Sequence, residues 1–218
     1  MSETVLIPGG RDVRASLDVA DFDSVDDESA AKSDADACVV ACPPHPQHRG
    51  HRGDERLRAV SDFLTERGID CLRFDYGDWD EGYGETTDAD NAVAWARERY
   101  DRVGLFGFSF GGCVALVTAA SNPDLRAVAA LAPAARLNPD TDAVAALDAL
   151  ADAGTPTRVV YATRDTTADW KPVVERAREL GLSVAEIDAD HFFVGKSGQV
   201  AKAVGRFLSP RLGSAGDP

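Results

Sequence analysis

Short apolar runs separated by polar and amphipathic stretches organise most of this chain. Runs of this length, bounded by Gly, Pro or polar residues, are typical of buried strands. The runs that predict strands are 37–41, 69–74, 103–106, 125–132, 158–162 and 183–187. Helices are predicted between and after them, over 54–67, 89–100, 113–120, 142–153, 169–180 and 200–208. Because strands and helices alternate, we expect right-handed crossovers and a mostly parallel, doubly wound α/β sheet.

The N-terminal region departs from this alternation. Residues 4–7 and 13–20 predict two short strands joined by a loop that contains Gly9 and Gly10, which favours an antiparallel hairpin at the edge of the sheet. Residues 21–37 are acidic with few large apolar side chains, so we expect a solvated loop there. A length of 218 residues fits one domain over 1–218, with 210–218 as a loose tail.

The charge balance narrows the classes of partner. The chain has 37 acidic and 23 basic residues and a net charge of −14, which argues against binding to nucleic acid or to an anionic membrane. Most of the acidic residues are Asp, and Lys is scarce. This composition is similar to that of proteins from salt-loving archaea. We therefore expect stability in concentrated KCl; the alternative is an ordinary acidic protein.

Cysteine usage and hydropathy bear on the compartment. The four cysteines lie in or beside apolar runs, so free buried thiols are expected rather than a disulfide framework; they are Cys38, Cys42, Cys71 and Cys113. The N-terminus has no basic segment followed by an apolar stretch, and no run approaches the roughly 20 apolar residues of a membrane span. These features predict a cytoplasmic protein.

The strongest chemical motif lies between the strand at 103–106 and the helix at 113–120. It is a G-x-S-x-G pattern formed by Gly107, Ser109 and Gly111. A serine on a sharp turn between strand and helix is strained, and bulky residues two positions away would collide with the turn. The alternative is an ordinary glycine-rich turn. Because both flanking runs fit, we predict that Ser109 is an exposed nucleophile.

Two further candidates follow later strands. Asp165 comes directly after 158–162, and His191 lies in the loop after 183–187. Functional groups of an open α/β sheet gather at the carboxyl ends of its strands. His191 is the only histidine late in the chain, although a surface loop histidine is the plainer interpretation. Asp165 is preferred over Asp188 and Asp190, which would have to fold back on the loop they share with the histidine.

Acyl transfer also needs two N–H donors for the developing oxyanion. One is the backbone N–H of Phe110, which follows the nucleophile. The second is expected in the loop after 37–41, where His45 stands between prolines that have no N–H; Gln47 is the alternative. The competing interpretation is a metal site, because Cys and His recur every third residue at Cys42, His45, His48 and His51. The prolines in that run and the absence of paired ligand spacing disfavour it, so we predict no metal and no cofactor.

The motifs together resemble the α/β-hydrolase superfamily, and more closely its small, lid-poor members related to dienelactone hydrolases. One branch of these carries a His-Pro-His-Pro segment, an Arg-Phe-Asn/Asp strand end, G-x-S-x-G and a late Ala-Asp-His-Phe-Phe. The corresponding residues here are 43–46, 73–75, 107–111 and 189–193. This chain has Pro43 in place of the first histidine and an acidic loop at 75–85. Dienelactone hydrolases use a cysteine nucleophile. Because this chain has serine at position 109, the resemblance does not imply dienelactone hydrolase activity.

The sequence therefore predicts a serine hydrolase that cleaves an ester or similar acyl bond of a small molecule through Ser109, Asp165 and His191. The insert at 134–154 is short, which favours an open cleft, and acids at 75–85 would discourage anionic substrates if they line it. The alternatives are a non-catalytic binding module with the same fold and a metal-dependent hydrolase that uses the His45 cluster.

Overall fold

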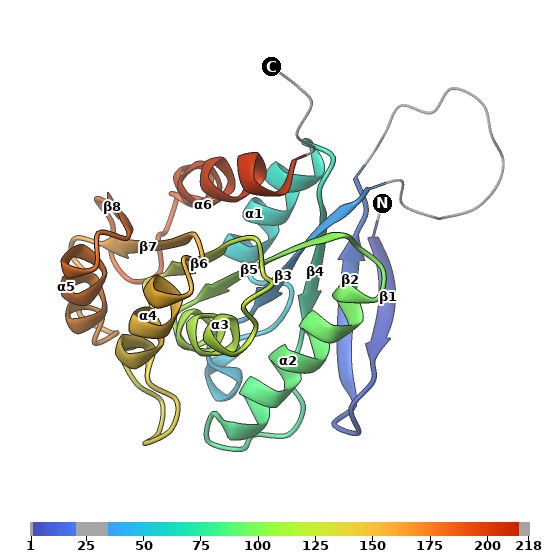
Figure 1. Cartoon of the computed structure of the whole chain (residues 1–218), viewed down its shortest axis with the longest axis horizontal. Coiled ribbons are helices and arrows are strands. Elements are labelled where there is room, and N and C mark those ends of the chain that lie inside the picture. The colour runs from blue at the N-terminus through green and yellow to red at the C-terminus, as the bar shows by residue number, and fades with distance from the viewer. Residues whose placement is uncertain (1, 21–34, 214–218) are drawn as a thin grey trace, which may run out of the picture.

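The computed structural model describes residues 2–20 and 35–213, and within them eight strands form one sheet (Figure 1). Its order is β1-β2-β4-β3-β5-β6-β7-β8. Strand β2 pairs antiparallel with both β1 and β4, and all the other neighbouring strands are parallel to each other. The strands are β1 Ser2–Ile7, β2 Val13–Asp18, β3 Ala37–Cys42, β4 Asp70–Phe74, β5 Arg102–Phe108, β6 Val128–Leu131, β7 Thr157–Ala162 and β8 Ser183–Ile187. The predicted parallel sheet with an antiparallel N-terminal edge is confirmed.

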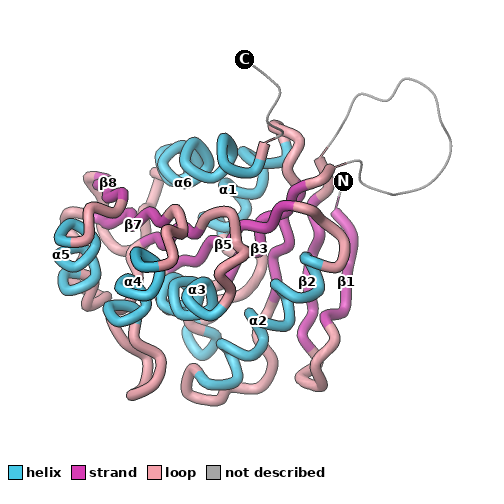
Figure 2. Tube along the Cα trace, viewed as in Figure 1, coloured by secondary structure: helices cyan, strands magenta, loops and turns pink. Residues whose placement is uncertain are grey.

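Helices cover both faces of the sheet, as Figures 1 and 2 show. One face carries α1 and α6, and the other carries α2, α3, α4 and α5. The helices are α1 Glu55–Thr65, α2 Tyr83–Arg97, α3 Phe110–Ser121, α4 Ala143–Asp152, α5 Lys171–Glu179 and α6 Ser197–Leu212. A short 3₁₀ turn, Pro46–His48, follows β3.

Two hydrophobic cores explain the continuous apolar runs of the central strands. In β3, Val40 packs in the core on the α2–α5 side, whereas Val39 packs in the core under α1 and α6. Every residue of β3 is buried. A strand covered on both faces must be apolar at every position, which is why its sequence lacks the alternation of a one-sided sheet.

Two helix boundaries differ from the sequence prediction by more than one helical turn. Helix α2 begins at Tyr83, where a loop was expected until Thr87, because the buried carboxylate of Glu85 accepts the N–H of Gly82 at 2.8 Å and stabilises the first turn. Helix α6 runs to Leu212, so the tail expected from residue 210 is wrong for its first residues. The Leu212 side chain is fully buried and lies against Gly104 of β5. Residues 214–218, and the acidic loop over 21–34, lie outside the described residues.

All four cysteines are free and buried, as predicted. Burial opposes the thiolate and raises the pKa of Cys71 and of Cys113 to about 12 in each case. At neutral pH these two thiols are therefore protonated and weakly nucleophilic.

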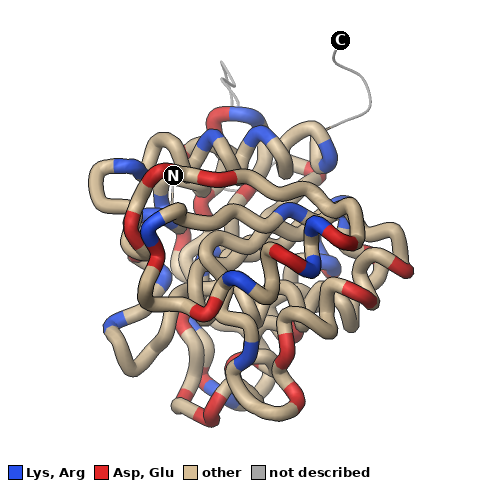
Figure 3. The backbone as a smooth tube through the Cα atoms, turned by 90° about the vertical axis from the view of Figure 1, so that its left-hand side faces the viewer, with Lys and Arg blue, Asp and Glu red and all other residues tan. Residues whose placement is uncertain are grey.

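The excess of acid is spread along the chain rather than gathered at one element. Figure 3 shows Asp and Glu on many separate elements, with Lys and Arg between them. Ion pairs such as Arg73–Asp18 and Arg176–Asp148 offset part of this charge. The expected stability in concentrated salt stays a prediction. Among the described helices, none has the length and apolar character needed to cross a lipid bilayer.

Candidate active site

The turn between β5 and α3 holds Ser109 in a strained backbone conformation. Its φ of 57° and ψ of −116° are uncommon for a residue with a side chain. A Cβ on Gly107 would overlap the backbone of Gly111, and one on Gly111 would overlap the backbone of the loop after β3. The two glycines of the motif are thus required by close backbone approach, and Ser109 stands half-buried at the carboxyl end of β5.

A chain of hydrogen bonds connects the three predicted side chains. The Nε2 atom of His191 lies 2.9 Å from the Oγ of Ser109, and its Nδ1 lies 2.7 Å from Oδ2 of Asp165. Asp165 cannot donate when ionised, so we assign the imidazole proton to Nδ1, which leaves Nε2 to accept from the serine hydroxyl. His191 and Asp165 are both buried. The arrangement can withdraw a proton from Ser109.

The local structure explains why Asp165 occupies this position. Its second carboxylate oxygen accepts the N–H groups of Thr167 at 2.8 Å and Ala168 at 3.1 Å, which orients the carboxylate toward the histidine. The alternatives are used elsewhere: the exposed Asp188 pairs with Arg164, and Asp190 accepts the N–H of Phe192 at 3.0 Å.

The histidine loop is held by a residue that the sequence did not single out. Arg56, in the first turn of α1, donates to the carbonyl oxygen of Phe192 at 3.0 Å and lies over the ring of Phe108. The Phe108 ring in turn lies 5.3 Å from the imidazole of His191, centroid to centroid. Arg56 and Arg58 both lie on this amphipathic helix, and no pattern in the sequence distinguishes one from the other.

The two backbone N–H groups predicted to bind an oxyanion belong to Phe110 and His45. Phe110 is the first residue of α3, and neither its N–H nor that of His45 has an acceptor among the described residues. Gln47, the alternative donor, is occupied, since its N–H donates to Nδ1 of His45 at 3.3 Å. Partial burial and the neighbouring His48 lower the pKa of His45, which favours the neutral imidazole that this bond requires.

Ion pairs from the neighbouring strands fix the loop that carries His45. Arg73 of β4 pairs with Asp18 of β2 and donates to the carbonyl oxygen of Arg52. Asp75 accepts both the backbone N–H and the guanidinium of Arg52. Arg73 and Asp75, which belong to the Arg-Phe-Asp segment that resembled a family motif, thus hydrogen-bond the loop after β3.

The histidines of this loop do not assemble into a metal site. The imidazole Nδ1 of His51 accepts the N–H of Gly53 at 2.9 Å, and the rings of His45 and His48 meet edge-on at 4.6 Å. Within residues 2–20 and 35–213, no three His, Cys, Asp or Glu side chains are placed to bind one metal ion.

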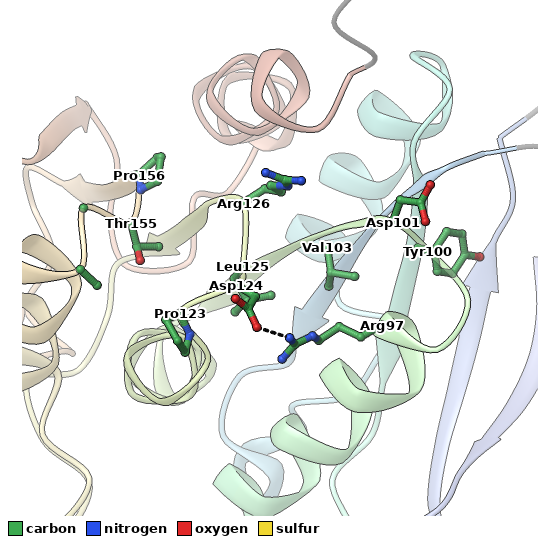
Figure 4. Close-up of a pocket in the computed structure, with 12 residues that line it drawn as sticks. Arg97, Tyr100, Asp101, Val103, Pro123, Asp124, Leu125, Arg126, Thr155 and Pro156 are labelled. Carbon is green, nitrogen blue, oxygen red and sulfur yellow. Dashed lines mark hydrogen bonds and ion pairs between the residues drawn. The ribbon is translucent and has the colours of Figure 1, made fainter.

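A separate cavity of about 710 Å³ lies at the opposite, amino end of the parallel strands (Figure 4). It is bordered by the ends of α2 and α4 and by the connection from α3 to β6, and Arg97 and Asp124 form an ion pair in it. The residues that line it include no serine, cysteine or histidine. The Thr155 hydroxyl in its lining therefore has no lining imidazole that could act as its base.

Comparison with solved structures identifies the fold. The chain superposes on an α/β serine hydrolase without a lid from Xanthomonas campestris with a TM-score of 0.77 and 21% identity, covering 100% of this chain and 97% of that one. For the Pyrococcus furiosus esterase the TM-score is 0.75 at 18% identity, with 98% and 93% covered. For a dienelactone hydrolase from Anabaena variabilis these values are 0.74 and 19%, with 98% and 99% covered.

Sequence comparison adds a family. An uncharacterized protein of Rickettsia prowazekii is 24% identical over 183 residues, 76% of this chain and 75% of that protein. The sequence model of the X-Pro dipeptidyl-peptidase (S15) family matches residues 74–186, just over half of the chain. That segment includes Ser109 and Asp165 and ends before His191. The family and the fold support hydrolase activity. The chain, which has the fold of an α/β serine hydrolase, belongs to the X-Pro dipeptidyl-peptidase (S15) family.

Proposed function

We propose that this protein is a serine hydrolase that cleaves an ester or similar acyl bond through a covalent acyl-enzyme. The observation that carries the proposal is the hydrogen-bonded chain from Ser109 through His191 to Asp165, with both outer distances below 3 Å. The strained backbone of Ser109 and the N–H groups of Phe110 and His45, which have no acceptor within the described residues, also support it. We assign them to nucleophile exposure and to oxyanion binding.

In the acylation step, the Oγ of Ser109 attacks the carbonyl carbon while its proton passes to Nε2 of His191. The bond from carbon to the leaving oxygen then breaks, and His191 returns the proton to that oxygen, which releases the alcohol. Asp165 stabilises the imidazolium that exists between these two events and keeps the Nδ1 proton in place.

Water completes the cycle. His191 removes a proton from a water molecule, which attacks the acyl carbon and displaces the Oγ of Ser109. The serine recovers its proton from the imidazolium, and the carboxylic acid leaves. In both steps the carbonyl oxygen becomes negative, and we assign its stabilisation to the N–H groups of Phe110 and His45. The other groups act within hydrogen-bond reach of one another and require no bound cofactor in this scheme.

The acyl-enzyme is directly testable. The protein mixed with p-nitrophenyl acetate and quenched within seconds should show a mass increase of one acetyl group, located on the peptide that contains Ser109. His191→Ala is the matched control, because it retains the serine and lacks the base, and it should remain unmodified on that timescale. Turnover of the ester without any acyl adduct, trapped or transient, would contradict covalent catalysis.

The family suggests a second candidate activity, the removal of X-Pro dipeptides from peptides. The Xanthomonas neighbour lacks a lid, and an esterase and a dienelactone hydrolase are among the fold neighbours. These likenesses favour an enzyme of the dienelactone-hydrolase-related branch with a small ester as substrate. Parallel assays with p-nitrophenyl butyrate and Gly-Pro-p-nitroanilide separate the two, and we expect turnover of the ester alone. Folded protein inert to both substrates and to a fluorophosphonate would instead indicate a non-catalytic binding module.

A further inference from the structure

Most of the large exposed apolar side chains in the described part of the chain lie at the end of the sheet that carries Ser109. Within the described residues, five large hydrophobic side chains are at least about one-third exposed, and four of them lie on the loops after β4 and β8 or at the start of α2. These are Trp79 at 36%, Tyr83 at 43%, Phe192 at 53% and Val194 at 76%; the fifth, Leu6 at 68%, is in edge strand β1. Exposed apolar area beside a reactive group indicates a surface that contacts substrate.

Trp79 lies directly beside the proposed oxyanion donors. Its indole stacks on the imidazole of His45, with ring centroids 4.7 Å apart and an interplanar angle of 25°, and lies 5.7 Å from the ring of Phe110. Phe192 lies on the other side of the site, edge-on to His191 at 5.3 Å. The two exposed aromatic side chains thus flank Ser109 from the donor side and from the base side.

The loop that carries Trp79 is held rigidly from within. Asp88 accepts the N–H of Gly77 at 2.9 Å and the Nε of Arg11 at 2.8 Å, while Arg11 also donates to the carbonyl oxygen of Asp78 at 2.5 Å. Glu85 accepts the N–H of Asp80 at 3.0 Å. The buried acids near this loop therefore hydrogen-bond its backbone on both sides of Trp79.

The reaction geometry determines which half of an ester lies next to Trp79. The leaving oxygen must be within reach of Nε2 of His191, since that atom returns the proton, so the alcohol lies on the side of His191 and Phe192. The carbonyl oxygen points toward the N–H groups of Phe110 and His45. The acyl substituent then extends away from His191, and Trp79 is the exposed aromatic side chain that packs on His45 and Phe110 rather than on His191.

We propose that Trp79 forms one wall of an acyl-binding surface that prefers an apolar, uncharged acyl group. This inference rests on the proposed function and adds the substrate class. Asp78, Asp80 and Glu81 are exposed and adjoin Trp79 in the chain, so a carboxylate at the end of the acyl chain would meet like charge on this loop.

The test is a comparison of acyl chains with the leaving group held constant. For p-nitrophenyl acetate, butyrate and hexanoate, kcat/KM of the wild-type protein should rise with chain length. Trp79→Ala should lower the ratio of hexanoate to acetate about tenfold, whereas Trp79→Phe, which keeps an aromatic wall, should retain most of it. Leu6→Ala removes a more exposed apolar side chain in edge strand β1, away from the site, and should leave the ratio unchanged.

Several outcomes would overturn the inference. An unchanged ratio in Trp79→Ala, or an equal loss for every acyl chain, would limit the indole to supporting His45. A loss that follows the size of the alcohol in a series of acetate esters would place Trp79 on the leaving-group side. These results would leave the serine mechanism intact. Wild-type protein that hydrolyses no ester and resists fluorophosphonate would overturn the proposed function, and this inference with it.

Discussion

The two ends of the parallel strands differ in what they offer to a ligand. At the amino end, a cavity of about 710 Å³ is lined by an arginine–aspartate ion pair and by helix ends. At the carboxyl end, a strained serine, a buried histidine and a buried aspartate meet within hydrogen-bond distance. The candidate reactive groups thus gather where the loops after successive strands converge, and not in the cavity at the amino end.

The difference arises from chain direction. All strands from β3 to β8 are parallel, so the loops after β3, β5, β7 and β8 meet at one edge and deliver His45, Ser109, Asp165 and His191 there. The opposite edge receives the ends of helices and their connections. Arg97 and Asp124 satisfy each other there, which leaves little net charge for a ligand.

The largest effect should come from the nucleophile. Ser109→Ala removes the atom that attacks the carbonyl and should lower kcat for p-nitrophenyl esters about 10⁶-fold, with His191→Ala comparable because the side chains act as one unit. Far-UV circular dichroism and the melting temperature should stay close to wild type. Retained turnover in a folded Ser109→Ala protein would move the chemistry away from the carboxyl end.

Asp165→Asn should have the next largest effect. The amide cannot hold a proton on Nδ1 of His191 as the carboxylate does, and we expect kcat to fall about 10⁴-fold. Asp188→Asn is the matched control, since this exposed acid pairs with Arg164 outside the site, and it should stay within about twofold of wild type. If the two variants were equally active, the assignment of Asp165 would be wrong.

A third prediction concerns the second oxyanion donor. His45 has a φ of −53°, which proline adopts readily, so His45→Pro removes the N–H while preserving the backbone angle. We expect kcat to fall about 10²-fold in His45→Pro and much less in His45→Ala, which lacks the imidazole and retains the N–H. Equal losses in the two variants would show that the ring and not the N–H matters.

The smallest effect is expected at the amino end. Arg97→Ala breaks a partly exposed ion pair, so kcat/KM should change by less than about twofold and the free energy of unfolding by less than about 1 kcal/mol. Steady-state kinetics and urea denaturation measure both quantities. A loss of activity as large as that of His45→Pro would mean that the amino-end cavity takes part in function.

The fold was largely predictable because burial on both faces leaves a local trace. Strands such as β3 are apolar at every position, and the boundaries of β8 coincide with the prediction. The start of α2 was missed because its first turn depends on the Glu85 carboxylate, and Tyr83-Gly84 resembles a loop in sequence. The end of α6 was missed because the burial of Leu212 against Gly104 is a contact between distant segments.

Part of the candidate site could likewise be predicted from the sequence, and part could not. Ser109, Asp165 and His191 could be predicted since each follows a recognisable strand, and the parallel topology brings strand ends together. Arg56 and Trp79 could not, because their importance lies in contacts with Phe192 and His45, which no periodicity or spacing encodes. The next question is a chemical one: does Ser109 react as a nucleophile?

Labelling by a fluorophosphonate answers that question most directly, because phosphonylation requires a serine activated by its histidine. Intact-mass and peptide analysis should show one adduct on wild-type protein, located on Ser109, and none on Ser109→Ala or His191→Ala. A folded wild-type protein that gains no adduct, or gains one on another residue, would contradict a nucleophile at the carboxyl end of β5.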